Sequence, residues 1–193
     1  MKITEFCHSF MQNFIKEGDF VIDCTIGNGI DTLFLCNCVG EGGKVLGFDI
    51  QEVALVKTKL LLEENGVSAR AELVLDSHEN VEKYFNECMQ GIALADRRPS
   101  CVVFNFGYMP GGDKKISTKA NSDIVAIDKS LGLLKRGGLL SLCIYSGGKS
   151  GFEEKEKLLA HLKELDNKKY LVIVCEYYNR GNNPPLPVFV IKQ

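Results

Sequence analysis

Short apolar runs alternate with longer amphipathic segments along the whole chain. The runs are rich in Val, Ile, Leu and Phe, and the segments repeat apolar residues every three or four positions. Continuous apolar runs are typical of parallel strands buried on both faces, and the longer period is typical of helices that cover them. The pattern predicts strands at 20–24, 44–49, 71–75, 101–105, 139–145, 170–177 and 187–191, and helices at 31–39, 51–64, 79–89, 117–134 and 152–165.

The N-terminal segment predicts one more helix, over residues 2–17, that packs on the core. Apolar residues recur there with helical spacing, which gives the helix one apolar face. Charged residues interrupt this stretch, so it is not a secretory signal. No run in the chain approaches the roughly 18 apolar residues of a membrane span, and we expect no membrane partner. The apolar face consists of Ile3, Phe6, Cys7, Phe10, Met11 and Phe14.

The order of the elements indicates an α/β fold. Five strand–helix units are followed by two strands, and the link between these two is polar, rich in proline and too short for a crossover helix. The last pair should therefore form an antiparallel hairpin. We predict a Rossmann-like, doubly wound, mostly parallel seven-stranded sheet with a C-terminal antiparallel hairpin. No linker, repeat or charge block divides the chain, so one domain over residues 1–193 is expected.

The composition adds limits on function. The chain is 45% hydrophobic and 25% charged, as globular proteins are, and its net charge is −2 with a pI near 6.0. The chain lacks the strongly basic surface of proteins that bind long nucleic-acid duplexes through charge, although a local basic patch could still bind RNA. Most of the eight cysteines lie inside apolar runs and no C-x-x-C pair occurs, which predicts reduced thiols, a cytoplasmic location and no metal site.

The first strand leads into a polar, glycine-rich turn, Asp23-Cys-Thr-Ile-Gly-Asn-Gly-Ile-Asp-Thr32. Gly27 and Gly29 permit a sharp turn and the close approach of a ligand, although a plain βα turn would use glycine too. A dinucleotide site requires G-x-G-x-x-G, but Thr32 replaces the third glycine and Asp31 would face the phosphates. Acids there repel an anion and attract a cation.

S-adenosylmethionine fits such a turn better, because it carries a sulfonium and an amino group and no phosphate. The pattern Asp-x-Thr-x-Gly-x-Gly departs from the methyltransferase pattern Asp/Glu-x-Gly-x-Gly-x-Gly only at Thr25. This turn therefore favours a methyltransferase over a nucleotide-binding oxidoreductase.

The ends of the second and third strands are also polar. Asp49 can accept hydrogen bonds from both ribose hydroxyls of an adenosine, or it can cap the helix that follows. Asp76, Ser77 and His78 stand where the adenine would lie. Two other interpretations remain open: Asp76 or Ser77 caps the next helix, and His78 is a solvated loop residue.

The fourth strand leads into Asn105-Phe-Gly-Tyr-Met-Pro-Gly-Gly-Asp113. This segment is similar to the Asn/Asp-Pro-Pro-Tyr loop of methyltransferases that act on amino nitrogens, with Phe106-Gly107 in place of Pro-Pro. In that chemistry the amide oxygen accepts the amine hydrogens and an aromatic ring stacks on the target base. We expect Asn105 and Tyr108 in these roles, with Phe106 exposed beside them. A loop that merely closes the strand is the alternative.

Together the motifs DCTIGNGIDTLFL, GFDIQ, DSHEN and NFGYMPGGDK resemble the bacterial family labelled putative rRNA methylase, and the resemblance covers essentially the whole chain. It implies a class I fold that uses S-adenosylmethionine. The characterised members of that family convert 5-aminomethyl-2-thiouridine at the tRNA wobble position to 5-methylaminomethyl-2-thiouridine. It also implies a tRNA anticodon loop as partner and a homodimeric assembly.

Roles for single residues follow from the resemblance. Asn28 and Asp31 would hold the methionine end of the cofactor, Asp49 and Gln51 the ribose, and Ser77 and His78 the adenine side. The full predicted cofactor site is Asp23, Thr25, Gly27, Asn28, Gly29, Asp31, Thr32, Asp49, Gln51, Asp76, Ser77, His78 and Asn105.

The acceptor amine would be protonated near neutral pH, as lysine is, and must lose a proton before it attacks a methyl group. Asp113, His78 and Tyr108 are candidate proton acceptors, and Asn105, Tyr108 and Asp113 form the predicted catalytic set. Predicted RNA contacts are Phe106, Tyr108, Lys114, Tyr145, Lys149, Arg180 and Asn182. The alternatives are an rRNA or small-amine methyltransferase, a nucleotide-binding oxidoreductase, and an inert cofactor-binding module.

Overall fold

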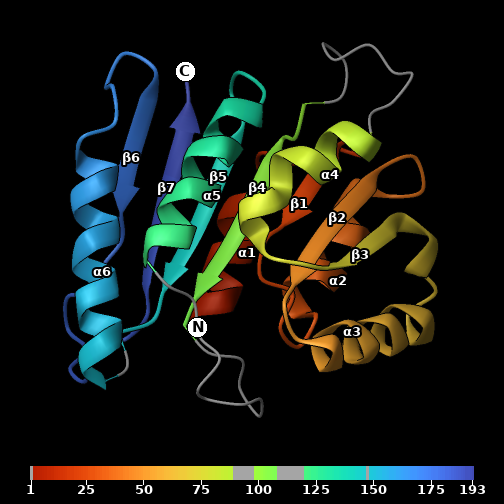
Figure 1. The fold of residues 1–193 in the computed structure, drawn as a ribbon, viewed down its shortest axis with the longest axis horizontal. Helices are drawn as coiled ribbons and strands as arrows, with labels where there is room; N and C mark the ends of the chain where they lie inside the picture. Colours follow the sequence, from red (N-terminus) through yellow and green to blue (C-terminus); the bar gives the residue numbers. More distant parts are fainter. Residues whose placement is uncertain (1, 89–97, 108–119, 147) are drawn as a thin grey trace.

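The computed structural model describes residues 2–88, 98–107, 120–146 and 148–193, with the backbone alone of residues 148–150. Within these ranges seven strands form one sheet in the order β3-β2-β1-β4-β5-β7-β6 (Figure 1). Strands β1 to β5 run parallel, and β7 lies antiparallel between β5 and β6. The strands are β1 (Phe20–Asp23), β2 (Lys44–Asp49), β3 (Ala71–Leu75), β4 (Cys101–Phe106), β5 (Leu139–Ile144), β6 (Tyr170–Val174) and β7 (Leu186–Lys192).

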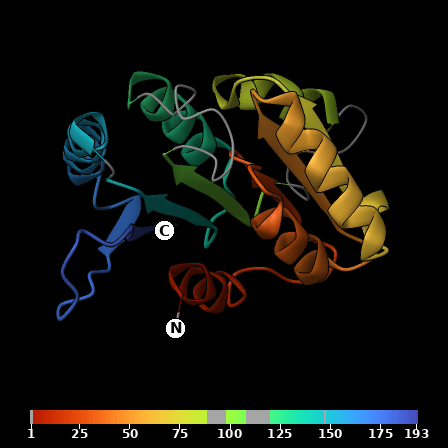
Figure 2. The same ribbon diagram turned by 90° about the horizontal axis from the view of Figure 1, so that it is seen from below.

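Helices cover both faces of this sheet. Buried side chains of the first three helices pack on one face and those of the last three on the other, and Figure 2 shows α1 and α5 on opposite sides. None of the described helices is long and apolar enough to cross a bilayer. The helices are α1 (Ile3–Met11), α2 (Ile30–Val39), α3 (Glu52–Glu64), α4 (Val81–Cys88), α5 (Ala120–Leu133) and α6 (Gly148–Lys163), with short 3₁₀ turns η1 (Ser68–Arg70) and η2 (His78–Asn80).

The predicted doubly wound sheet and its C-terminal antiparallel hairpin are confirmed. Helix α1 is shorter than the expected 2–17 range, because the chain tightens after Met11: the Phe14 N–H donates to the Met11 carbonyl at 2.9 Å. Gly18 then adopts a left-handed φ of 84° and directs the chain into β1. Strand β6 ends at Val174 rather than residue 177, and α6 begins at Gly148 rather than residue 152.

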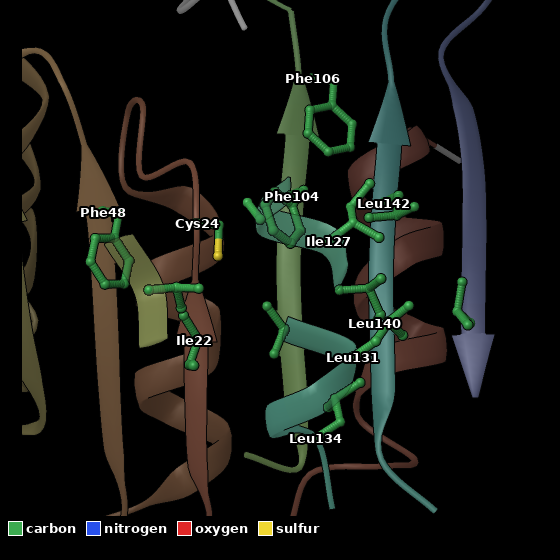
Figure 3. Packing of buried hydrophobic residues seen from close by; sticks show 14 of the residues in the cluster. Ile22, Cys24, Phe48, Phe104, Phe106, Ile127, Leu131, Leu134, Leu140 and Leu142 are labelled. Carbon is green, nitrogen blue, oxygen red and sulfur yellow. The ribbon is translucent and has the colours of Figure 1, made fainter. Parts of the chain in front are cut away.

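One half of the core lies between α5 and the centre of the sheet. Ile127 and Leu131 of α5 pack against Phe104 and Leu142 on strands β4 and β5 (Figure 3). Phe106 belongs to this cluster: its side chain is fully buried and its ring centroid lies 5.2 Å from that of Phe104. The expectation that Phe106 is exposed to RNA is therefore wrong. Strand β4 continues through residue 106, and the two-residue period of a strand places both rings under α5.

The other half of the core lies under α1 to α3. Cys7 and Met11 of α1 are buried there, and the ring of Phe10 stacks on Phe189 of β7 at 4.0 Å between centroids. The N-terminal helix thus packs on the sheet through the apolar face predicted for it. All eight cysteines are free and five of them are buried, which fits their predicted use as small apolar side chains.

Candidate functional site

The carboxyl ends of β1, β2 and β4 meet at one edge of the sheet. Strand β1 lies between β2 and β4 and runs parallel to both, so the helices that follow β1 and β4 leave toward opposite faces. In open α/β sheets this change of direction creates a crevice, and ligands bind there. Most of the predicted site residues lie on the turns at this edge.

The turn after β1 is held by Asp23 and by two glycines. Asp23 is completely buried; one carboxylate oxygen accepts the Thr25 N–H at 3.1 Å and the other accepts the Thr32 hydroxyl at 2.7 Å. Gly27 and Gly29 have left-handed φ values of 54° and 78°. A Cβ on Gly29 would also lie 2.5 Å from the Thr58 hydroxyl oxygen, so helix α3 can pack here only against glycine.

The environment of Asp23 changes its acidity. Burial, with a contribution from the neighbouring Asp31 carboxylate, raises the pKa of Asp23 from 3.8 to about 7, against the opposing hydrogen bonds from Thr32 and Thr25. A buried carboxyl group near a second acid favours its neutral form. Acidic side chains therefore occupy the turn at the position where the phosphates of a dinucleotide would have to bind.

Asp49, at the end of β2, reaches across to the same turn. One of its carboxylate oxygens accepts the Gly27 N–H at 2.9 Å, and the other accepts the Gln51 N–H at 2.9 Å. A carboxylate offers about four acceptor positions. Two therefore remain after these bonds, which suits the pair of hydroxyls on a ribose. A Cβ on Gly27 would meet only the Thr25 carbonyl oxygen within 4 Å, at 3.9 Å, so a ligand can approach closely there.

Asp31 joins three segments of the chain at this edge. Its Oδ1 lies 2.6 Å from Nε2 of His8 on α1, and its Oδ2 accepts the Asn105 side-chain amide at 2.7 Å. The backbone N–H of Asn105 donates to the Thr25 hydroxyl at 2.7 Å, so Thr25 connects β1 to β4. The structure thus brings Thr25, Asp31 and Asn105 together as expected. His8 was not predicted here; the only signal in the sequence is a polar residue beside the apolar face of α1.

The turn after β3 has a different arrangement. Asp76 accepts hydrogen bonds from the Ser77 N–H at 2.7 Å, from the Tyr84 hydroxyl at 3.0 Å and from the Asn80 amide at 3.0 and 3.1 Å. Desolvation alone would raise the pKa of Asp76, but these hydrogen bonds outweigh it and lower the pKa. The Ser77 hydroxyl accepts the Glu79 N–H at 3.3 Å, so the predicted alternative of a cap is confirmed for Ser77.

His78 is held by neighbouring elements. Its Nδ1 lies 3.2 Å from the Cys24 carbonyl oxygen and its Nε2 lies 3.1 Å from a carboxylate oxygen of Asp123 on α5. The His78 side chain is only 12% exposed, so the solvated-loop interpretation is wrong. Both ring nitrogens face acceptor atoms, which connects the end of β1 to α5.

The remaining predicted residues lie farther along the edge or outside the described ranges. Tyr145 follows β5 beside Gly107, and burial, together with the Cys143 thiol, raises the pKa of its phenol above the usual range. Arg180 and Asn182 lie on the β6–β7 loop, and the Arg180 guanidinium covers the ring of Tyr177 at 4.4 Å. Tyr108, Asp113 and Lys114 fall outside the described residues, as does the side chain of Lys149.

The donor set fits one kind of nucleoside ligand. The carboxylates of Asp31 and Asp49 lie beside the glycine turn: Asp49 accepts the Gly27 N–H and Asp31 accepts the Asn105 amide. They would repel a pyrophosphate and stabilise a ligand that carries positive charge and a ribose. S-adenosylmethionine has both features.

Comparisons with known proteins agree with this geometry. Residues 45–191 match the family described as "Putative rRNA methylase". A chloroplastic tRNA (mnm(5)s(2)U34)-methyltransferase from Arabidopsis thaliana is 36% identical over 197 residues, which span 98% of this chain and 68% of that protein.

Solved structures are similar over the full length as well. A putative rRNA methylase from Clostridium thermocellum is 41% identical with a TM-score of 0.92, covering 100% of this chain and 98% of its own. A putative methyltransferase from Streptococcus mutans, in complex with SAH, is 32% identical with a TM-score of 0.85, covering 100% and 99%.

Proposed function

Because the chain belongs to the rRNA methylase family and is an S-adenosylmethionine-dependent methyltransferase, we propose that it methylates the amino nitrogen of 5-aminomethyl-2-thiouridine at the tRNA wobble position. The Arabidopsis relative, whose name specifies that modification, supports the choice of acceptor. The single observation that carries the proposal is the orientation of the Asn105 side chain at the end of β4.

Asn105 is held so that its oxygen can serve as an acceptor. The carboxylate of Asp31 only accepts hydrogen bonds, so the amide group that faces it at 2.7 Å is the nitrogen, and Oδ1 points the other way. The bond from the backbone N–H to Thr25 fixes the position of the residue. An oxygen presented in this way would accept a hydrogen of the substrate amine and direct the nitrogen lone pair.

The cofactor would be held by Asp49 through the ribose and by the acidic surroundings of the glycine turn through its positive charge. When bound, it supplies a methyl carbon attached to a sulfonium leaving group. The acceptor amine, protonated in water like lysine, would favour its neutral form in the desolvated crevice. Alignment of a bound nucleophile by fixed side chains can contribute roughly 7–11 kcal/mol in favourable cases.

His78 is a poor choice among the predicted proton acceptors. A base needs a nitrogen lone pair directed at the substrate, but both ring nitrogens of His78 already face the Cys24 carbonyl and the Asp123 carboxylate. We therefore propose that His78 positions the β3–α4 turn, and that Asp113 and Tyr108 remain the candidate proton acceptors.

The β6–β7 loop is the proposed RNA contact. Strand β6 runs parallel to β5, so this loop lies at the same edge as the glycine turn, and the arrowheads of β4, β5 and β6 point to one edge in Figure 1. Tyr178 is fully exposed, and Arg180 stacks on Tyr177. Residues 155, 176–178 and 180–186 line a hollow of about 220 Å³. Aromatic and guanidinium planes suit unpaired bases, as in an anticodon loop.

We also propose that the protein is a single-domain, cytoplasmic homodimer. Eight free cysteines support a reducing compartment. Val53, Val56 and Leu60 form an exposed apolar stripe on α3, 45–55% exposed, which would suit a subunit interface.

Mass spectrometry of nucleosides from cells with and without the gene tests the proposed acceptor. Loss of the gene should cause 5-aminomethyl-2-thiouridine to accumulate in tRNA, and the purified protein with S-adenosylmethionine should convert it to the methylated form. Altered rRNA with normal tRNA would replace the proposal with an rRNA methyltransferase. Unchanged tRNA and rRNA would point to a small amine substrate.

Replacing Asn105 with alanine tests the proposed catalytic geometry. We expect Asn105→Ala to lower single-turnover methyl transfer about 100-fold, the scale on which misplaced reacting groups act, while cofactor affinity changes less than about threefold. Asn65→Ala is the matched control, because among the described residues the Asn65 side-chain amide donates only to the carbonyl of Leu61, at the far end of α3. Equal rates for wild type and Asn105→Ala would remove this side chain from the mechanism.

A further inference from the structure

His8 is the one residue from the N-terminal helix whose polar group is described at the predicted site. Its Nε2 lies 2.6 Å from Asp31, and its ring lies parallel to Phe34 of α2, with 3.8 Å between centroids and 5° between planes. The side chains of His8 and Asp31 are 19% and 12% exposed. Stacking and partial burial together restrict the imidazole to one orientation toward the carboxylate.

The helix that carries His8 is itself fixed to the sheet. Cys7 and Met11 are buried, and Phe10 stacks on Phe189 of β7. The packed helix α1 therefore holds the His8 imidazole in a fixed position beside Asp31. A hydrogen bond between fixed groups loses little entropy when it forms, so it can hold its partner in one rotamer.

Asp31 needs such a partner because of its surroundings. It lies near the buried Asp23, whose pKa is raised first by burial and then by the charge of Asp31. Without His8, Asp31 would keep only Asn105 among the partners that the described residues provide, so its side chain would no longer be restricted to one rotamer. The Asn105 amide would then be free to rotate.

We propose that His8 is a positioning residue for methyl transfer, which acts through Asp31 to keep the Asn105 amide oxygen facing the acceptor amine. This chain of contacts, His8–Asp31–Asn105, is called the amide clamp below. It rests on the proposed role of Asn105 in amine methylation, and it extends the site to a helix outside the residues matched by the family.

Two substitutions separate the hydrogen bond from the packing. His8→Phe keeps a ring on Phe34 but removes the donor; His8→Gln keeps an N–H near the Nε2 position but removes the ring. We expect His8→Phe to lower kcat about tenfold or more, with the KM for S-adenosylmethionine within about twofold of wild type, and His8→Gln to recover most of kcat. A role in stability alone would not produce recovery by Gln.

The chain offers a matched control in a second His–Asp pair. His161 on α6 lies 2.7 Å from Asp128, with side chains 25% and 53% exposed. His161→Phe should leave both kcat and KM unchanged. In the Asn105→Ala background, His8→Phe should cause no further loss, because the clamp has nothing left to orient. Multiplied losses in the double variant would overturn the proposal.

A measurement without the acceptor keeps this test separate from the proposed function. The side-chain amide signals of Asn105 in an ¹⁵N–¹H NMR spectrum should shift in His8→Phe and stay in place in His161→Phe. If wild type fails to methylate the tRNA but the Asn105 signals shift, the acceptor is wrong and the clamp stands. Unmoved Asn105 signals, or wild-type kcat in His8→Phe with active protein, would refute the clamp.

Discussion

The turns after β1 and β3 begin alike and end in different arrangements. Each follows a parallel strand, starts near an aspartate and precedes a helix. After β1, polar groups connect distant segments: Asp31 bonds to Asn105, 74 residues away, and Thr25 bonds to the same residue across 80. After β3, the partners of Asp76 lie one, four and eight residues away.

The two turns differ in how many hydrogen-bond acceptor positions of their aspartates remain free for a ligand. A carboxylate has about four acceptor positions. Asp76 uses them on Ser77, Tyr84 and both contacts from Asn80, all in its own turn. Asp49 uses two, on the backbone of Gly27 and Gln51. We infer that the edge beside β1 and β2 is open to a ligand, whereas the acceptor positions of Asp76 after β3 are occupied within its own turn.

The largest expected effect comes from the buried acid of the first turn. The pKa of Asp23 is about 7 in the folded protein and near 3.8 in a model peptide. Between these values the folded state retains a proton that the unfolded state releases, so the free energy of unfolding falls as the pH rises through this window. Asp23→Asn removes this dependence and keeps an acceptor for the Thr25 N–H.

Urea unfolding should therefore show that Asp23→Asn gains about 2.5 kcal/mol relative to wild type between about pH 5 and pH 8, at roughly 1.4 kcal/mol per pH unit within the window. Asp166→Asn is the control, since the Asp166 side chain is 47% exposed and its described partners are local: the Lys168 N–H at 2.9 Å and the Lys169 ammonium at 3.8 Å. If the free energy of unfolding depended on pH in the same way for wild type and Asp23→Asn, Asp23 would have an ordinary pKa in the folded protein.

The next effect compares the two turns directly. Asp49→Ala should weaken S-adenosylmethionine binding by about tenfold or more, because a hydrogen bond to a charged group contributes about 1.5–3 kcal/mol. Asp76→Ala should change the affinity less than about threefold, because its acceptor positions are occupied. Titration calorimetry with S-adenosylmethionine measures the affinity of both variants and of wild type. Equal losses at the two positions would mean that both turns hold the ligand.

Much of this site could be predicted from the sequence, because the polar ends of apolar runs converge on one edge of a parallel sheet. That rule predicts Asp49 and Asn105 at this edge, and the loop motif after the fourth strand adds to the prediction for Asn105. Phe106 was misplaced although the signal was present: the alternation from Phe104 puts it on the same buried face. His8 could not be found in this way, since spacing along the chain gives no distance between residues 8 and 31.

The smallest expected effect tests whether the turn after β3 is closed. Ser77 caps the 3₁₀ turn that begins α4, with a bond of 3.3 Å to the Glu79 N–H. Ser77→Ala should lower the free energy of unfolding by about 0.5–1 kcal/mol, as loss of a cap does, and leave S-adenosylmethionine affinity unchanged. Ser9→Ala serves as the control, because in the described part of the chain the exposed Ser9 hydroxyl donates only to the Glu5 carbonyl within α1. Weaker cofactor binding without a change in stability would mean that the Ser77 hydroxyl faces the adenine. Both turns would then contact the cofactor, and they would differ only in how much each contributes to its affinity.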